Sequence, residues 1–233
     1  MIMPISKHIG KYAIKHGAKP ETIRVIYHGV DTSLFLQLPD KKFKKSLDIK
    51  NKKVVSFIAR LNKDKYADDV IEVASKVCKI KKNVVFLMVG DGKDREELEK
   101  RSHDLGLDNN VRFLGFQARE KAAKIMLISD INLCLLGGFS LIEAVMSGKP
   151  TIAYDIEWQN EVIKNDETGL LVANRDIEAV TRAIIKLLNN QGIAKKIGDN
   201  ARRLALKTYS LGNTSKIKIK YYNELLNMKS SHK

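Results

Sequence analysis

The sequence is poor in the residues and runs that mark secreted or membrane-spanning proteins. It has two cysteines among 233 residues, and both Cys78 and Cys134 lie in apolar periodic segments, which predicts core packing rather than a disulfide or metal role. The longest apolar runs, VVSFIA and VVFLMVG, are far shorter than the roughly 20 residues of a membrane span. No charged segment followed by an apolar one opens the sequence, so we expect a cytoplasmic protein.

Several motifs of nucleotide-binding and nucleic-acid-binding proteins are also missing. Neither G-x-x-x-x-G-K-[ST] nor G-x-G-x-x-G occurs, which argues against nucleotide hydrolysis and dinucleotide binding. Basic residues are not interleaved with aromatic ones, which argues against nucleic acid as a partner. We expect neither a metal nor a cofactor, since no spacing typical of metal ligands supports one.

Positive charge is concentrated at the two ends of the sequence. The formal net charge is +15, and residues 1–53 hold 12 Lys and Arg against 4 Asp and Glu, whereas residues 193–233 hold 10 against 2. We expect these ends to attract phosphates, an anionic lipid surface or an acidic partner, and so to allow peripheral contact with the cytoplasmic face of a membrane. A solvated, lysine-rich surface without a partner is the competing interpretation.

The middle of the sequence alternates between two hydrophobic periods. Segments of helical period, such as ADDVIEVASKVCKI and DIEAVTRAIIKLLNN, are separated by short continuous apolar runs typical of strands buried on both faces. The alternation predicts a Rossmann-like α/β domain, a doubly wound parallel sheet with helices on both faces. The predicted strands are residues 53–59, 84–90, 111–115, 131–136, 151–154 and 169–172.

The flanking regions divide the chain into three expected segments. Residues 1–22 form an N-terminal helix, over about residues 6–17, and a connector. Residues 23–192 form the Rossmann-like domain. Residues 193–233 form two basic helices, split near SLGN, that complete the domain.

One turn places two glycines directly before a helix, in the stretch GGFSLIEAVMSG. In a doubly wound sheet, ligands bind beyond the carboxyl ends of the strands, where helix N-termini point. Such a turn can bring backbone N–H groups close to a phosphate or diphosphate. Ser140 and Glu143 also fit a capping box, S-x-x-E, which would stabilise the helix start without any ligand. Spacing alone does not separate the two interpretations.

Two further turns strengthen the interpretation as a ligand site. In ARLNKDKY, Arg60 and Lys65 lie five residues apart after a predicted strand, and two cations beside a helix N-terminus can clamp a diphosphate. In VGDGKD, residues 89–94, a glycine turn again joins a strand to a helix. Because the carboxyl ends of parallel strands share one edge of a sheet, we expect the three turns to meet.

Six segments together resemble the donor-binding, C-terminal half of family 4 retaining glycosyltransferases, which have the two-domain B-type fold. They stand in the family's order and spacing as YHGVDTSLF, ARLNKDKY, GDGKDREEL, VRFLGF, GGFSLIEAVMSGKPTI and EVIKNDETGLLVANRD. The resemblance covers about residues 6–227. It implies a domain that binds a nucleotide-sugar donor, UDP- or GDP-linked, and transfers the hexose with retention to a glycan or lipid-linked acceptor.

The resemblance also implies roles for individual residues. Arg60 and Lys65 match the pair that grips the donor diphosphate and stabilises it as it leaves, and Glu143 matches the acid that binds the ribose hydroxyls. The other residues implied at the donor are the glycine turn Gly90, Asp91 and Gly92, the base-flanking Arg112 and Phe113, and the helix start Gly138, Phe139, Ser140 and Leu141.

Two departures from the family pattern bear on function. The acceptor-binding half, about one more domain, has no counterpart, so we expect a separate acceptor-domain subunit or partner chain. The family's leading glutamate, eight positions before Glu143, is Leu135 here, and Gly137 takes its place if the turn is shortened by two residues. Since that acid contacts the transferred sugar, the alternative function is a catalytically silent donor domain that binds nucleotide or a partner. A polyanion-binding protein that uses its basic ends is a third hypothesis.

Overall fold

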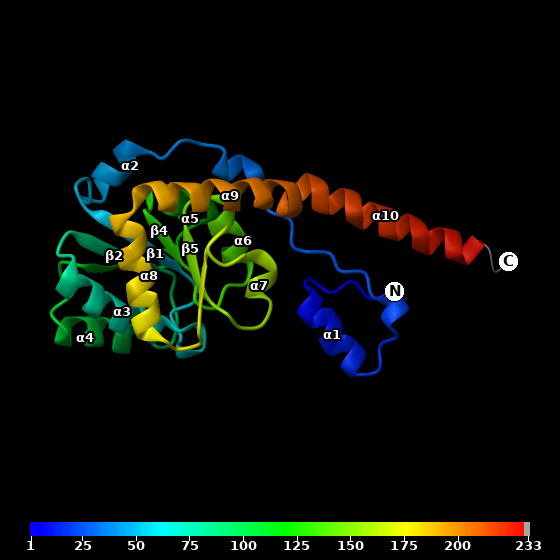
Figure 1. Cartoon of the computed structure of the whole chain (residues 1–233), viewed down its shortest axis with the longest axis horizontal. Coiled ribbons are helices and arrows are strands. Elements are labelled where there is room, and N and C mark those ends of the chain that lie inside the picture. The colour runs from blue at the N-terminus through cyan, green and yellow to red at the C-terminus, as the bar shows by residue number, and fades with distance from the viewer. Residues whose placement is uncertain (231–233) are drawn as a thin grey trace.

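The computed structural model describes residues 1–230, and its centre is one sheet of six parallel strands (Figure 1). The strands follow one another across the sheet in the order β3-β2-β1-β4-β5-β6. The order of strands reverses between β1 and β4, which is therefore the switch point of a doubly wound fold. The strands are β1 Lys53–Ile58, β2 Val84–Val89, β3 Val111–Phe113, β4 Ile131–Leu133, β5 Thr151–Tyr154 and β6 Leu170–Val172.

Helices cover both faces of the sheet. Side chains alternate along β1, so Val55 and Phe57 pack on one layer of helices whereas Val54 packs on the other. The first layer consists of α3 (Ala67–Ile80), α4 (Arg95–Asp104) and α8 (Ile177–Asn189). The second consists of α2 (Lys41–Ser46), α5 (Arg119–Ile128), α6 (Phe139–Met146), α7 (Gln159–Val162) and α9 (Gln191–Tyr209).

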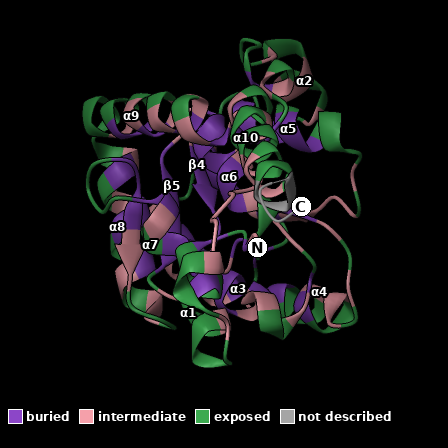
Figure 2. Cartoon of the chain, turned by 90° about the vertical axis from the view of Figure 1, so that its right-hand side faces the viewer, coloured by how far each residue is buried: buried purple, intermediate pink, exposed green. Residues whose placement is uncertain are grey.

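The predicted fold class is confirmed, and each strand lies within one of the apolar runs. The reason is burial: every residue of β2 and of β5 is buried, because helices cover the sheet on both sides. Purple ribbon in Figure 2 accordingly fills the sheet and the inner sides of the surrounding helices. β1 to β4 end before the apolar runs do, because the last residues of these runs already belong to the turns, whereas β5 and β6 end where their runs end.

The first 26 residues form a small unit beside the main sheet (Figure 1). Helix α1 (Lys7–Lys15) and the short 3-10 helix η1 (Pro20–Thr22) join two extended segments. Ile2 and Ile23 form a parallel bridge, and the N–H of Ile26 donates to the carbonyl of Pro4 over 2.9 Å. The unit is thus a two-stranded parallel pair with α1 as its crossover.

Glu161 on α7 ties this unit to the domain. Its carboxylate accepts hydrogen bonds of 2.8 Å from the N–H groups of Lys7 and His8, and one of 2.9 Å from the Tyr27 hydroxyl. A carboxylate at a helix N-terminus is favoured by the helix dipole. One side chain therefore fixes both the start of α1 and the connector that follows the unit.

The C-terminal region forms two helices, as predicted. α9 ends at Tyr209, Ser210 is extended, and α10 (Leu211–Ser230) projects past the domain beside the N-terminal unit (Figure 1). Ser210 forms a parallel bridge with Val30, which follows the connector and precedes the short 3-10 helix η2 (Thr32–Phe35). In residues 1–230, no helix combines the length and the apolar character needed to span a bilayer.

Candidate functional site

The turns after β1 and β4 emerge side by side at the switch point of the sheet. Phe57 of β1 is in register with Leu133 of β4, so both strands deliver the chain to the same edge. The first turn carries Arg60 and Lys65, and the second leads into α6, which carries Glu143. The three residues singled out from the sequence therefore share the carboxyl edge of the sheet, which we call the donor edge.

The buried thiol of Cys134 lies within electrostatic range of two of these charged residues, Lys65 and Glu143. Burial raises the pKa of Cys134 to about 12, a hydrogen bond with Ser140 opposes this, Glu143 raises the pKa further, and Lys65 lowers it. Both the carboxylate and the ammonium group therefore act on one thiol. The chain thus brings Lys65 from one turn and Glu143 from the other to the same small region.

The two cations of the first turn are available to a ligand. The Arg60 guanidinium lies 3.6 Å from the Asp64 carboxylate, but both side chains are more than half exposed, at 67% and 57%, so this pair is weak. Lys65 ends the short 3-10 helix η3 (Lys63–Lys65) and makes no ion pair with any residue of the described chain. Neither cation has an internal role that a bound diphosphate would have to displace at high cost.

The predicted capping box does not form. Gly138 occupies the N-cap position of α6 and provides no side-chain cap, and the Ser140 hydroxyl lies 3.6 Å from the Cys134 sulfur. Within residues 1–230, the N–H groups of Gly138, Phe139 and Ser140 find no acceptor. The N-terminus of α6 therefore offers three N–H groups without a partner in the described chain, an arrangement that suits an anion.

Glu143 is paired with an arginine that the sequence reasoning missed. The guanidinium Nε of Arg119, the first residue of α5, donates to its carboxylate over 2.8 Å. Burial raises the pKa of Glu143, whose side chain is 13% exposed, and Arg119 opposes that rise. Arg119 follows β3 at the start of a helix, so its position after a strand was the available signal.

An aromatic ring links this pair to the connector. The Arg119 guanidinium lies 5.4 Å from the centre of the Phe139 ring, and the His28 ring lies 5.0 Å from it on a 48° tilt. His28 therefore lies against the first residue of α6. Phe139 is 39% exposed, so its ring forms part of the surface at the donor edge.

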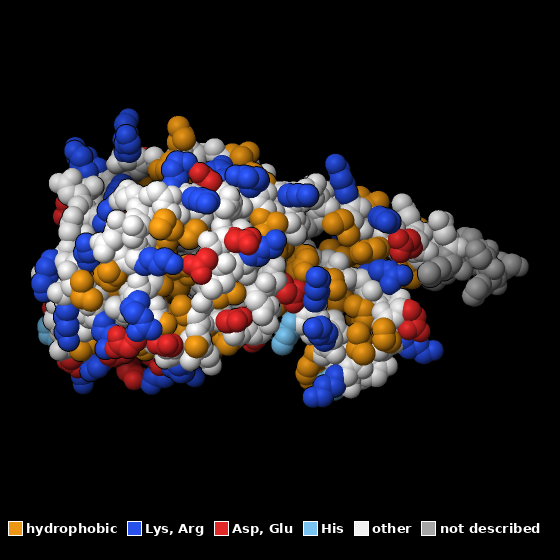
Figure 3. Space-filling model, in the orientation of Figure 1, with side chains coloured by type: hydrophobic (Ala, Val, Ile, Leu, Met, Phe, Trp, Pro, Cys, Tyr) orange, Lys and Arg blue, Asp and Glu red, His pale blue; other side chains and the backbone are white. Residues whose placement is uncertain are grey.

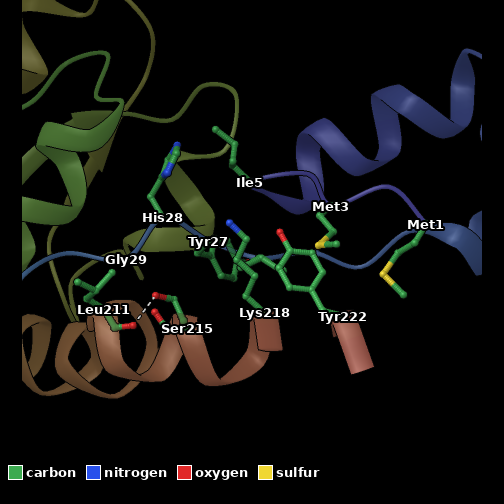
Figure 4. Close-up of a pocket in the computed structure, with 12 residues that line it drawn as sticks. Met1, Met3, Ile5, Tyr27, His28, Gly29, Leu211, Ser215, Lys218 and Tyr222 are labelled. Carbon is green, nitrogen blue, oxygen red and sulfur yellow. Dashed lines mark hydrogen bonds between the residues drawn. The ribbon is translucent and has the colours of Figure 1, made fainter. Parts of the chain in front are cut away.

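A cavity of about 440 Å³ extends from His28 between the connector and α10 (Figure 4). Figure 4 shows Met3 and Tyr222 close together at its far end and Leu211 and Ser215 along α10. The lining is mainly apolar, with hydroxyl groups and the ammonium of Lys218. The cavity and the donor edge therefore meet at His28.

The VGDGKD turn needs glycine at two positions because the backbone of the turn after β1 lies directly against it. A Cβ at Gly90 would overlap the carbonyl oxygen of Ala59, and its φ of +137° also favours glycine. A Cβ at Gly92 would overlap the backbone of Leu61. The turn after β2 is thus packed directly on the turn after β1, which holds Arg60 in place.

The other residues implied at this turn and at the base have different partners. The Asp91 carboxylate accepts from the N–H of Gly92 over 2.8 Å and lies 3.3 Å from Arg95. The Arg112 guanidinium donates to the carbonyl of Leu47, after α2, so the structure does not bring this group to the donor edge. Phe113 packs against the core beside β2.

Gln159 holds the turn after β4, and it was also missed. It is fully buried, and its amide donates to the carbonyls of Leu135 and Tyr154 over 2.8 and 2.7 Å, while its oxygen accepts from the N–H of Gly137 over 2.9 Å. Leu135 itself is fully buried. At the position of the family's leading acid, this chain therefore has a core residue, Leu135. The side-chain amide of Gln159 holds the N–H of the neighbouring Gly137. Gln159 stands in the mainly polar stretch DIEWQNE, so the sequence offered no signal that sets it apart.

Charge on the surface is mixed rather than of one sign. On the face shown in Figure 3, Lys and Arg side chains are spread over the domain and along α10, whereas Asp and Glu gather at the lower left. Asp68, Glu72, Glu97 and Asp104 line a groove between α3 and α4. The donor edge combines cations and helix N–H groups with the acids Asp64 and Glu143, while a separate group of acids lines the groove between α3 and α4.

Comparisons with known proteins agree with this geometry. Residues 39–204 match the family model described as "Glycosyl transferases group 1". An uncharacterized glycosyltransferase of Methanocaldococcus jannaschii is 29% identical over 233 residues, which cover 97% of this chain and 59% of that protein. The chain is therefore shorter than this relative by about two fifths of the relative's length.

Two crystal structures share the arrangement of elements. That of Anabaena HepE in complex with UDP and glucose superposes with a TM-score of 0.87 at 23% identity, covering 97% of this chain and 63% of that one. That of a Staphylococcus aureus TarM variant in complex with fondaparinux, alpha-GlcNAc-glycerol and UDP gives a TM-score of 0.78 at 25% identity, covering 95% of this chain and 43% of that one.

Proposed function

Because the chain belongs to the glycosyl transferases group 1 family, we propose that it binds a nucleoside-diphosphate sugar at its donor edge and transfers the hexose with retention, as family 4 enzymes do. The observation that carries this proposal is that the turn with Arg60 and Lys65 and the turn that leads into α6, the helix of Glu143, leave the same edge of the sheet at the switch point. The UDP held by the S. aureus TarM variant supports a donor of this class.

The proposed chemistry uses fixed positive charge. As the bond between the anomeric carbon and the diphosphate breaks, negative charge builds on the leaving phosphate. Arg60, Lys65 and the free N–H groups of residues 138–140 would stabilise that charge, and each such contact contributes about 3–4 kcal/mol in enzymes where it has been removed. Glu143 would accept hydrogen bonds from the ribose hydroxyls. No step in this scheme requires a resident metal or cofactor.

Calorimetric titration with UDP, GDP and ADP tests the donor proposal. We expect saturable binding of one of them and loss of that binding in Arg60→Ala. Absence of binding for all three nucleotides would contradict the proposal. Binding that Arg60→Ala leaves unchanged would instead remove the clamp from the mechanism.

A silent donor domain is the second candidate function, and Leu135 favours it. The position that the family uses for the acid at the transferred sugar is buried here, and the neighbouring Gly137 is held by Gln159. Such a protein would bind nucleotide without turning it over. A donor-hydrolysis assay, with and without a candidate acceptor-domain partner, separates the two, because only the enzyme releases sugar under either condition.

We further propose that a separate acceptor-binding domain completes the N-terminal unit. A parallel strand pair is normally covered on both faces, whereas this pair has one crossover helix and exposes Ile2 at 43% and Ile9 at 42%. The chain spans 59% of its M. jannaschii relative, which leaves room for such a domain in the longer protein. A purified chain that stays monomeric and transfers sugar unaided would contradict this proposal.

A cytoplasmic location, with the basic ends in contact with anionic lipid, stays a prediction. Fractionation of cells that produce the chain tests it, since peripheral electrostatic contact is released by salt. Retention on the membrane at high salt, or recovery outside the cytoplasm, would contradict it.

A further inference from the structure

A second cavity lies at the amino edge of the sheet, opposite the donor edge. Its volume is about 170 Å³, several times the ~30 Å³ that one water occupies in the liquid. It is formed where β1 and β5 begin and where α8 gives way to α9. The lining residues that matter for its charge are Lys53, Asp130, Lys149 and Lys195.

The one carboxylate in this lining is already engaged. Asp130 Oδ1 accepts from the ammonium of Lys53 over 2.9 Å, and Asp130 Oδ2 accepts from the N–H of Val54 over 2.9 Å. The ammonium of a second lysine, Lys44 on α2, lies 4.0 Å from Asp130 Oδ2. Two lysines and a backbone amide therefore share the negative charge of one aspartate.

Lys149 adds a positive charge that makes no direct ion pair with this aspartate. Its ammonium makes no hydrogen bond or ion pair with any residue of the described chain. Burial lowers the pKa of Lys149; Asp130 opposes this, and Lys44 and Lys53 lower the pKa further. Lys149 is only partly exposed. An ammonium group that is partly removed from water and has no partner carries a desolvation cost, and a bound anion would reduce that cost. Lys195 is paired with Asp199, so it is not needed for this charge balance.

The start of α9 adds to the positive potential. Asn190 occupies the N-cap position, but its side chain donates to the carbonyl of Lys186 and does not cap α9. The first turn of α9 contains no acidic residue, and Gln191 and Ala194 line the cavity. The N-terminal end of the α9 dipole therefore borders the same cavity as Lys149, beside the last turn of α8, whose Leu187 and Leu188 also line it.

We propose that this cavity is a binding site for a phosphate-class oxyanion, separate from the donor edge. The group recognised is a phosphate dianion, either free or carried on a small monoester. Lys149 would supply the direct ion pair, with Lys53 and Lys44 adding longer-range attraction. The site is independent of the proposed donor chemistry, because no residue of the donor edge contributes to it.

Amide chemical shifts measured by NMR at constant ionic strength test the proposal, with inorganic phosphate in one arm and glycerol 3-phosphate in the other. We expect saturable shifts at Gly148, Lys149, Gln191 and Ala194 in at least one arm, and the arm with tighter binding identifies the source of the phosphate group. Shifts confined to the donor edge, or shifts that do not saturate in either arm, would overturn the proposal.

Variants make the test specific to Lys149. We expect Lys149→Met to weaken binding by about tenfold or more and Lys149→Arg to retain it, since an ion pair to a phosphate needs the charge. Lys124→Met, at an exposed lysine of α5, is the matched control. Equal affinity in wild type and Lys149→Met would overturn the proposal. If Lys149→Met does not fold, Lys53→Met provides the same comparison at a second lysine of the lining, and unchanged affinity there counts against the site.

Affinity for the nucleotide separates the two sites. Lys149→Met is expected to bind UDP as wild type does, while Arg60→Ala is expected to bind inorganic phosphate at the amino edge as wild type does. Loss of the phosphate shifts in Arg60→Ala would mean that the anion occupies the donor edge, and it would overturn the second site.

Discussion

The guanidinium of Arg119 donates to the carboxylate of Glu143 over 2.8 Å and thereby joins the start of α5 to α6 across the donor edge. Burial raises the pKa of Glu143 and Arg119 opposes that rise. Arg119 therefore keeps in its charged form the carboxylate that we assign to the ribose hydroxyls. It also faces Phe139, so it packs against the turn that would receive the diphosphate.

Replacing Arg119 should make nucleotide binding more sensitive to pH. In Arg119→Leu, burial acts on Glu143 without opposition, so its pKa rises further and less of it is ionised at mildly acidic pH. We expect the affinity for UDP to fall more steeply in this variant than in wild type as the pH is lowered. Calorimetry across the acidic range measures this. Lys121→Leu, at an exposed position of the same helix, is the control, and an identical pH profile in all three proteins would contradict the role of Arg119.

Glu143 should also leave a signature in the stability of the fold. Since its pKa is raised in the folded state, the folded protein binds this proton more tightly than the unfolded chain does. The free energy of unfolding should therefore fall as the pH rises from about 4.3, the ordinary value for glutamate, through the raised value. Glu143→Gln has no titrating carboxyl at this position, so its free energy of unfolding should not fall in this way. Its stability relative to wild type should therefore increase over that pH range. Urea unfolding at several pH values measures the difference, and parallel curves would be evidence against a raised pKa.

The two cations of the first turn should contribute to nucleotide affinity without supporting the fold. Arg60→Ala and Lys65→Ala should each weaken UDP binding by about tenfold or more, because a charge-assisted hydrogen bond contributes about 1.5–3 kcal/mol. Lys63→Ala is the matched control in the same turn, since Lys63 pairs with Glu97 on α4. Thermal unfolding should change little in either site variant because Arg60 is 67% exposed. A loss of affinity of the same size in Lys63→Ala would indicate a general charge effect.

Gln159 should be needed for both stability and the shape of the donor edge. Gln159→Ala removes the acceptor of the Gly137 N–H and one donor each to the carbonyls of Leu135 and Tyr154, although the Leu135 carbonyl still accepts from the Tyr154 N–H. Each buried group left unsatisfied costs about 1–3 kcal/mol. We expect a loss of several kcal/mol in the free energy of unfolding and weaker binding of UDP. Asn160→Ala, at the exposed neighbouring residue, should change stability by no more than about 0.5 kcal/mol. Urea denaturation measures both, and equal effects would show that the buried amide has no special role.

Two glycines of α9 should respond in opposite directions to alanine. A Cβ at Gly198 would overlap the carbonyl oxygen of Gly148, where α9 crosses the turn before β5, whereas a Cβ at Gly192 would meet no atom within 4 Å. Gly198→Ala should therefore destabilise the fold by about 1–3 kcal/mol. Gly192→Ala should be neutral or raise stability by up to about 1 kcal/mol, because alanine favours the helix. Differential scanning calorimetry distinguishes them, and a stable Gly198→Ala would mean that α9 can shift on the sheet.

Much of the fold could be predicted because burial on both faces leaves a visible trace in the sequence. Runs such as VVFLMV can be strands only where helices cover both sides, and these runs match the strands of the structure. The motif order placed Arg60, Lys65 and Glu143 after strands that neighbour one another, and the structure brings them to one edge. These features depend on neighbours along the chain or on a single strand order, so the sequence contains them.

Contacts between distant segments were decided only by the tertiary structure. Ser140 and Glu143 have the spacing of a capping box, yet Ser140 meets Cys134 and Glu143 meets Arg119, because the strand before α6 and the start of α5 lie beside that helix. Arg112 has the spacing of a base-flanking residue, yet its guanidinium reaches the end of α2. A polar side chain bonds with whatever lies nearest in space, and local spacing does not determine which segment that is.

The sequence by itself determined the alternation of strands and helices, the sheet edge to which Arg60, Lys65 and Glu143 belong, and the family. The tertiary structure decided which charges are paired, since Glu143 has Arg119, whereas the partly exposed Lys149 has no partner in residues 1–230. The physical reason is that hydrophobic periodicity depends on residues that are close together along the chain. Burial, hydrogen bonding and ion pairing depend instead on distances between remote segments, which are set only when the sheet forms.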